Sequence, residues 1–195
     1  MRFVAPSPTP PTPSSDPLDF TGRSVVVTGG SRGLGRVITA TFLDAGADVV
    51  TCARGAPDEP ITSTDGSREA AFVVADVRDP EQVAAVVAAT VERSGRVDVL
   101  VNNAAGNFYA PSATLSPNAW KSVVEIDLYG TFYCSQAVYP IMAAQGGGRI
   151  VSTSMTLHYR GWPMMAHATA AKAGVDALTR TLAVEWAPQR IRVNA

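Results

Sequence analysis

The sequence is poor in cysteine, has no surplus of either charge and contains no long apolar run. Its two cysteines, Cys52 and Cys134, are far apart and form no CxxC pair, so we interpret both as small core residues of a protein in a reducing compartment and expect no metal site. The formal net charge of −1 leaves no electrostatic footprint for nucleic acid or an anionic membrane surface. We therefore expect small molecules or other subunits as partners.

Apolar residues are interspersed with polar ones throughout, so neither a secretory signal nor the roughly 18 apolar residues of a membrane span is found. These absences favour a cytoplasmic protein that has no membrane partner. Proline is concentrated among Ser and Thr in the first seventeen residues, a composition that cannot form a helix or bury a core. The sequence thus predicts a disordered Pro-rich tail over 1–17 and one domain over 18–195.

A glycine-rich turn follows the first β-branched run of the domain. The run 25–28 leads into Gly29, Gly33 and Gly35, after which apolar residues recur with helical spacing. Such a turn lets a pyrophosphate approach the backbone and directs the N–H groups of a helix start at that anion. Glycines also occur in strand–helix turns for steric reasons alone, but the second apolar strand at 47–52 completes a β-turn-α-β unit. This unit favours dinucleotide binding.

Strand and helix patterns alternate along the rest of the chain. Strands are predicted near 24–28, 48–52, 71–75, 97–101, 149–153 and 190–194. Helices are predicted near 33–45, 80–94, 117–144 and 166–187, and 54–70 is expected to be a loop or a weakly helical insertion. The fold class is therefore α/β, a Rossmann-type doubly wound parallel sheet. We expect it to be truncated in or after strand six, with the C-terminal part of the domain missing.

Polar residues stand at the predicted carboxyl ends of several strands, where ligands bind in sheets of this class. They are Asp76 after the third strand, Asn102 and Asn103 after the fourth and Ser152 to Ser154 after the fifth, with Lys172 on the last helix. Each of these residues could instead have a purely structural role, since Asp76 could cap a turn, the asparagines could adopt left-handed backbone and the serines could be ordinary loop residues. Their joint placement at successive strand ends favours a functional site.

Three of these features together resemble the short-chain dehydrogenase/reductase family, from about Leu18 to the end. They are Thr28-Gly29-x-x-x-Gly33-x-Gly35, Asn102-Asn103-Ala104 and the lysine Lys172 on the helix after strand five. The resemblance implies a nicotinamide cofactor, with Lys172 on its ribose. The cofactor-binding residues that it implies are Gly29, Ser31, Arg32, Gly33, Leu34, Gly35, Arg54, Asp76, Val77, Asn103, Ala104, Ala105 and Lys172.

The charge around the second strand favours NADPH over NADH. A carboxylate at the end of that strand would bind the ribose hydroxyls and repel a 2′-phosphate, whereas this chain has Ala53 and Arg54 there. Arg32 adds a second guanidinium from the glycine turn. The alternative is that either arginine is only a solvated surface charge.

Two departures from the family pattern bear on the reaction. Ala168 stands where most members have a tyrosine acid, and Asp127 stands where most have an asparagine. With Ala104 to Phe108 and His167-Ala168-x-x-x-Lys172, these departures are similar to the peroxisomal-type 2,4-dienoyl-CoA reductases. That similarity implies an acyl-CoA substrate and catalysis by Asp127 and Lys172 through a positioned water. Asn107 and Phe108, which follow the strand-four turn, could frame the acyl chain, and Ser154, Arg160 and His167 could contact the thioester or the CoA. The alternative for Asp127 is a helix-surface carboxylate, and for His167, which we favour slightly, a packed residue at a helix start.

Two other functions are possible on the sequence. One is a 3-oxoacyl or ketone reductase that uses another acid, for which Tyr159 is the candidate, although it lies too far before Lys172 to replace the usual tyrosine. The other is a catalytically inert NAD(P)-binding protein. The resemblance also implies that the full-length protein is a homo-oligomer, a dimer or tetramer, and that it would be peroxisomal if a missing C-terminus carried the signal.

Overall fold

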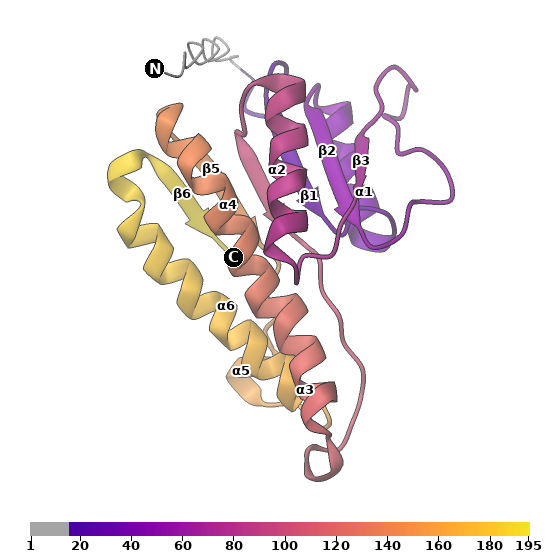
Figure 1. Cartoon of the computed structure of the whole chain (residues 1–195), viewed down its shortest axis with the longest axis vertical. Helices are drawn as coiled ribbons and strands as arrows, with labels where there is room; N and C mark the ends of the chain where they lie inside the picture. The colour runs from indigo at the N-terminus through magenta and orange to yellow at the C-terminus, as the bar shows by residue number, and fades with distance from the viewer. Residues whose placement is uncertain (1–15) are drawn as a thin grey trace.

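A computed structural model describes residues 16–195 of the chain, so the tail predicted over 1–17 lies almost entirely outside the described residues. Its centre is a six-stranded parallel sheet with the strand order β3-β2-β1-β4-β5-β6 (Figure 1). The strands are β1 (Ser24–Thr28), β2 (Asp48–Ala53), β3 (Ala71–Val74), β4 (Val99–Asn102), β5 (Gly148–Ser152) and β6 (Ile191–Asn194). The chain order reverses between β1 and β4, and in such sheets this reversal opens a crevice at the carboxyl ends of the strands. The predicted doubly wound Rossmann-type sheet is confirmed.

Helices connect these strands as predicted, except that β2 and β3 are joined without a helix. They are α1 (Gly33–Asp44), α2 (Pro80–Ser94), α3 (Pro117–Val124), α4 (Gly130–Ala144), α5 (Leu157–Arg160) and α6 (Ala166–Glu185). The predicted helix over 117–144 is continuous, but a π-helical turn, η2 (Glu125–Tyr129), joins α3 to α4. The short α5 was not predicted. Segment 54–70 has no helix and contains one isolated bridge, between Thr62 and Glu69.

Two apolar layers enclose the sheet because alternate side chains of each strand point to opposite faces. Val25 and Val27 pack in a cluster with Leu43 of α1, whereas Val26 and Leu100 pack in a larger cluster beneath α2, α4 and α6. Both predicted core cysteines belong to this larger cluster. Burial raises the pKa of Cys52 to about 11 and raises that of Cys134 further, so both remain neutral thiols.

A smaller lobe extends past the carboxyl ends of the strands. It consists of α3, α5 and the first turns of α6, which lie together at the bottom of the view in Figure 1. A third apolar cluster of Val123, Met165 and Ala168 holds it together. Residues 103–116 run from the sheet into this lobe. Within residues 16–195, none of the helices combines the length and the apolar character that crossing a membrane requires.

Candidate functional site

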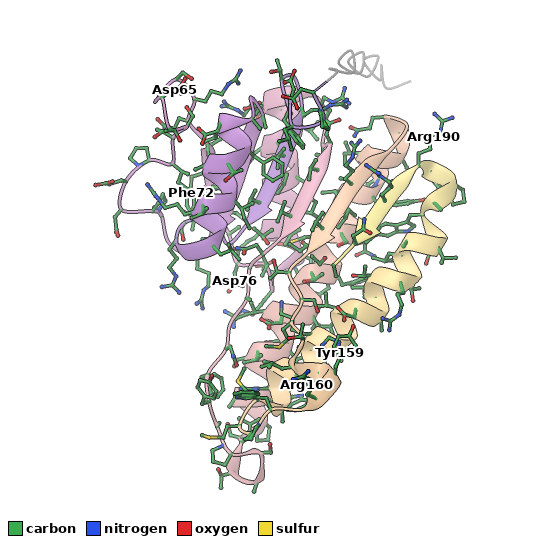
Figure 2. All side chains as sticks on the ribbon, turned by 180° about the vertical axis from the view of Figure 1, so that it is seen from behind. Asp65, Phe72, Asp76, Tyr159, Arg160 and Arg190 are labelled. Atoms are coloured by element: carbon green, nitrogen blue, oxygen red, sulfur yellow. The ribbon has the colours of Figure 1, made fainter. Side chains whose placement is uncertain are left out.

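A cleft of about 610 Å³ opens at the carboxyl ends of the strands, where the chain order reverses. Every residue that sequence reasoning assigned to cofactor binding lines this cleft, except Lys172. Residues 52–58, from the end of β2 and the segment after it, form one wall. Asp76 and Val77 line it after β3, and Figure 2 shows Asp76 near the middle of the molecule. The structure thus brings together residues from five segments of the chain.

Two of the three glycines in the turn, Gly29 and Gly35, are packed so closely that a side chain would not fit there. A Cβ on Gly35 would collide with the carbonyl oxygen of Gly29, and a Cβ on Gly29 would lie 2.9 Å from the Cα of Ala104. Gly33 has a φ of +54°, and nothing lies within 4 Å of the place where its Cβ would be. Because this open glycine begins α1, the turn presents free backbone N–H groups and the positive end of the helix dipole to the cleft.

The end of β4 is tied to this turn by hydrogen bonds. The backbone N–H groups of Asn103 and Ala104 both donate to Thr28 Oγ1 at 3.0 Å. The side-chain amide of Asn103 donates to the carbonyl oxygens of Thr28 and Gly29, at 3.0 and 3.3 Å. The side chain of Asn103 therefore fixes the shape of the turn. Sequence reasoning did not single out the hydroxyl of Thr28, although its position directly before the glycines was a usable signal.

Charged residues of both signs line the cleft. They are Asp76 and the exposed residues Arg32, Arg54 and Asp58. Asp76 accepts a hydrogen bond at 2.9 Å from Nε of Arg78, which holds the pKa of that carboxyl below its usual range, so the carboxylate is paired with the guanidinium of Arg78. Asp76 also accepts from the backbone N–H of Arg78 at 3.0 Å, so it caps a turn as well as lining the cleft. Arg78 was not found from the sequence.

Asp127 and Lys172 meet beside the cleft, between η2 and α6. Asp127 Oδ2 lies 3.9 Å from Lys172 Nζ, and only 2% of the Asp127 side chain and 7% of the Lys172 side chain are exposed. Asp127 Oδ1 accepts a hydrogen bond of 2.8 Å from the backbone N–H of Gly106, and Lys172 Nζ donates at 2.7 Å to the carbonyl oxygen of Thr153. The alternative that Asp127 is a helix-surface carboxylate is wrong.

Burial moves the pKa values of this pair toward each other. Loss of solvent raises the pKa of Asp127, and the positive charge of Lys172 and the Gly106 hydrogen bond oppose this shift without cancelling it. Loss of solvent lowers the pKa of Lys172, against the attraction of Asp127 and Asp176. Two titratable groups that burial shifts in this way, 3.9 Å apart beside a cleft, are typical of a functional site.

The predicted substrate residues flank this pair. Asn107 and Phe108 follow Gly106, which binds Asp127, and Ser154 follows Thr153, which binds Lys172. The Asn107 amide donates to Met165 Sδ at 3.3 Å. Ser154 Oγ is buried and has no hydrogen-bond partner in the described part of the chain.

His167 and Tyr159 differ sharply in environment. His167 is fully buried, in an edge-to-face contact with Phe108 at 4.6 Å between ring centres, so the slightly favoured interpretation as a packed residue is confirmed. Tyr159 is 74% exposed, and its hydroxyl donates to Asp176 at 3.4 Å (Figure 2). Ala168, at the position of the usual tyrosine, is buried and offers no proton donor.

Comparisons with known proteins agree with this geometry. Residues 23–195 match the family model for short chain dehydrogenases. The chain is 45% identical over 173 residues to the peroxisomal 2,4-dienoyl-CoA reductase of Danio rerio, which produces (3E)-enoyl-CoA, covering 86% of this chain and 57% of that protein. It is 42% identical over 174 residues to the enzyme of the same name from Rattus norvegicus, covering 87% of this chain and 59% of that protein.

Carveol dehydrogenase from Mycobacterium avium, solved in complex with NAD, superposes with a TM-score of 0.81 at 32% identity, covering 90% of this chain and 69% of that structure. The chain spans a little less than three fifths of the length of the two curated relatives named above.

Proposed function

We propose that this chain, which belongs to the short-chain dehydrogenase family, forms the cofactor-binding part and the catalytic pair of an NADPH-dependent reductase of 2,4-dienoyl-CoA thioesters. The observation that carries the proposal is the buried pair of Asp127 and Lys172 in a site where alanine replaces the usual tyrosine. The names of the relatives from Danio rerio and Rattus norvegicus support the substrate class and a (3E)-enoyl-CoA product.

The residues of the cleft fit a dinucleotide. The turn at Gly29, Gly33 and Gly35 leaves open space and free N–H groups where a pyrophosphate would bind, and Asp76 and Val77 line the cleft on the side we assign to the adenine. Arg32 and Arg54 support a 2′-phosphate, and the carboxylate of Asp76 is already paired with the guanidinium of Arg78. When bound, NADPH supplies a hydride to the far carbon of the conjugated diene.

The chain's own residues then have two tasks. The Lys172 ammonium, which has donors left after its bond to Thr153, can offset the negative charge that develops on the thioester oxygen. Asp127 and Lys172 are 3.9 Å apart, a spacing at which one water can bond to both. That water delivers a proton to the carbon next to the thioester and takes one in return from the Asp127–Lys172 pair, so no hydroxide is left. The double bond of the product then lies between the third and fourth carbons. Because no alkoxide is protonated, a tyrosine acid is not required.

The compartment and assembly belong to the proposal as well. We propose a cytoplasmic or peroxisomal enzyme that forms a homo-oligomer through α4 and α6. Exposed apolar side chains at Tyr129, directly before α4, and Val184, on α6, support a protein contact, with exposed fractions of 47% and 79%. Light scattering of the purified full-length protein tests this part, and a monomer at micromolar concentration would contradict it.

The test of function is NADPH oxidation by the full-length protein with a 2,4-dienoyl-CoA, compared with a 3-ketoacyl-CoA. We expect turnover with the dienoyl thioester only. The Asp127→Ala variant should lose about 10²- to 10⁴-fold in kcat and still bind NADPH. Reduction of the ketoacyl thioester alone would instead support a ketone reductase, and NADPH binding without any turnover would support an inert binding protein.

A further inference from the structure

The wall of the cleft beside β2 is formed by a loop that turns back along α1. Residues 54–58 line the cleft, and the chain then leaves it and forms the bridge between Thr62 and Glu69. Figure 2 shows Asp65, at the turn of this loop, at the upper edge of the molecule, away from the cleft residue Asp76 near the middle. Because 54–58 have no regular secondary structure, the position of this wall depends on what holds its far end.

A single side chain of α1 holds that end. Arg36 Nη1 donates to the carbonyl oxygen of Glu59 at 3.0 Å, and Nη2 donates to that of Pro60 at 2.9 Å. Both arms of the guanidinium fork are thereby used on consecutive carbonyls, an arrangement that lysine cannot reproduce. Arg36 is half-buried and lies one helical turn after the cleft residue Arg32, to whose carbonyl oxygen its own N–H donates at 3.2 Å.

The rest of the loop is anchored independently. Ile61 is 3% exposed and packs in the cluster beneath α1. Asp44, at the other end of α1, accepts from the backbone N–H and the hydroxyl of Thr64 at 2.6 and 2.9 Å. Removing Arg36 would therefore free the wall as far as Pro60 and leave the loop beyond it in place.

We propose that Arg36 is a positioning residue that sets the preference for NADPH over NADH by fixing where Arg54 and Asp58 stand. The inference rests on the proposed function, which assigns NADPH to the cleft. Arg36 does not itself line the cleft, so it acts through the wall. The fixed wall keeps the guanidinium of Arg54 next to the place where the 2′-phosphate would bind. It also keeps the carboxylate of Asp58 at a constant position. NADH has no phosphate there, so its binding does not depend on this arrangement.

The test measures the dissociation constants of NADPH and NADH by fluorescence titration of the full-length protein without acyl-CoA. Arg36→Gln should weaken NADPH binding about five-fold, the effect of losing one moderately strong charged contact, and change NADH binding less than two-fold. Arg36→Lys should lie between. Arg68→Gln, which removes an exposed positive charge from the same loop beyond Pro60, should change neither. Thermal unfolding of each variant should match the wild type.

A double-mutant cycle identifies the route of the effect. In an Arg54→Gln background, Arg36→Gln should weaken NADPH binding less than two-fold, because the charge that Arg36 positions is already absent. Equal losses for both cofactors, full additivity, or an unchanged preference would each overturn the inference. If the wild type shows no preference for NADPH, the proposed cofactor fails as well. If the wild type prefers NADPH and Arg36→Gln keeps that preference, only the role of Arg36 fails.

Discussion

The two ends of the sheet each contain a buried aspartate, and the two carboxyls behave in opposite ways. Asp98 lies at the amino end, directly before β4, and Asp127 lies at the carboxyl end, with 5% and 2% of their side chains exposed. Asp98 accepts two bonds of 2.7 Å from Arg96, one from Arg23 and one from the backbone N–H of Ser24. Asp127 accepts one backbone bond and faces Lys172 at 3.9 Å.

The number of donors explains the difference. Burial pushes the pKa of Asp98 upward, but the bonds from Arg96, Ser24 and Arg23 outweigh it, so the pKa is lowered. The partners of Asp127 do not outweigh burial, and its pKa is raised. A buried carboxylate with complete partners stabilises the fold, whereas one with incomplete partners is available to hold a water or a substrate. The same residue type thus serves structure at one end and, by our proposal, chemistry at the other.

The largest effect that this comparison predicts comes from Asp127→Asn. The amide keeps the acceptor for Gly106, and Lys172, unlike the guanidinium of Arg96, can release its proton because burial already lowers its pKa, so the free energy of unfolding should change by about 1 kcal/mol or less. Turnover of a 2,4-dienoyl-CoA should fall about 10²- to 10⁴-fold, with NADPH affinity unchanged. Steady-state kinetics and urea unfolding test this, and an active amide variant would break the comparison.

Replacing the aspartate at the amino end by asparagine should lower stability and leave turnover unchanged, the reverse of the result for Asp127→Asn. Asp98→Asn leaves the buried guanidinium of Arg96 without a counter-charge, which should cost about 3–5 kcal/mol of stability. The kcat per folded molecule should not change, because Asp98 is at the opposite end of the sheet from the cleft. Urea unfolding and kcat corrected for the folded fraction measure both. A kcat that falls as far as for Asp127→Asn would show that the two ends are not separate.

The stability difference between wild type and Asp98→Asn should become smaller as the pH falls. Because the pKa of Asp98 is lowered on folding, its contribution is present above the unfolded value of 3.8 and is lost as pH falls through the lowered folded value. Asp127 acts oppositely, since its raised pKa means that ionisation costs stability as pH rises above 3.8. Urea unfolding at neutral and acid pH tests this. The free energies of unfolding of Asp98→Asn and Asp127→Asn should both approach that of the wild type under acid conditions.

Thr28→Val probes how rigidly the carboxyl end is held, with a smaller effect. The loss of its hydroxyl leaves the N–H groups of Asn103 and Ala104 unpaired, which should cost about 1–3 kcal/mol and weaken NADPH binding. Thr39→Val is the control, since the hydroxyl of Thr39 is also buried but donates only to a helix carbonyl, that of Gly35. Equal effects of both substitutions on NADPH affinity would contradict the role of Thr28.

Local patterns were sufficient to predict the sheet, whereas the full list of site residues depended on a family resemblance. The strands were found because apolar runs are bounded by glycine and polar turns, and Asp76 and Asn103 because strand ends of a parallel sheet meet. The π-helical turn at Glu125–Tyr129 was not predicted, because no residue type signals a wider helical turn. The burial of Asp127 in that turn therefore could not be predicted, although the residue itself was identified through a family resemblance.

Contacts between distant segments were also beyond sequence reasoning. Nothing in the local sequence distinguishes Arg36 from other polar residues on a helix. Its hydrogen bonds to the carbonyls of Glu59 and Pro60 depend on how an irregular loop folds back. The lysine predicted to bind the cofactor ribose, Lys172, lies beside the cleft and not in its lining, because its amine reaches the carbonyl of Thr153. These positions are set by tertiary packing, which leaves no periodic signal in the sequence.

The smallest predicted effect tests whether burial, and not ion pairing as such, gives the amino end its stability. Arg93 Nε lies 2.6 Å from Asp48 Oδ1, closer than any contact of Asp98, but the two side chains are 47% and 31% exposed. Solvent screens such a pair, so Arg93→Gln should cost at most about 1 kcal/mol, and less in high salt. Urea unfolding at low and high ionic strength measures it. If Arg93→Gln were as costly as Asp98→Asn, the number of ion pairs would matter more than their burial, and the contrast between Asp98 and Asp127 would need another cause.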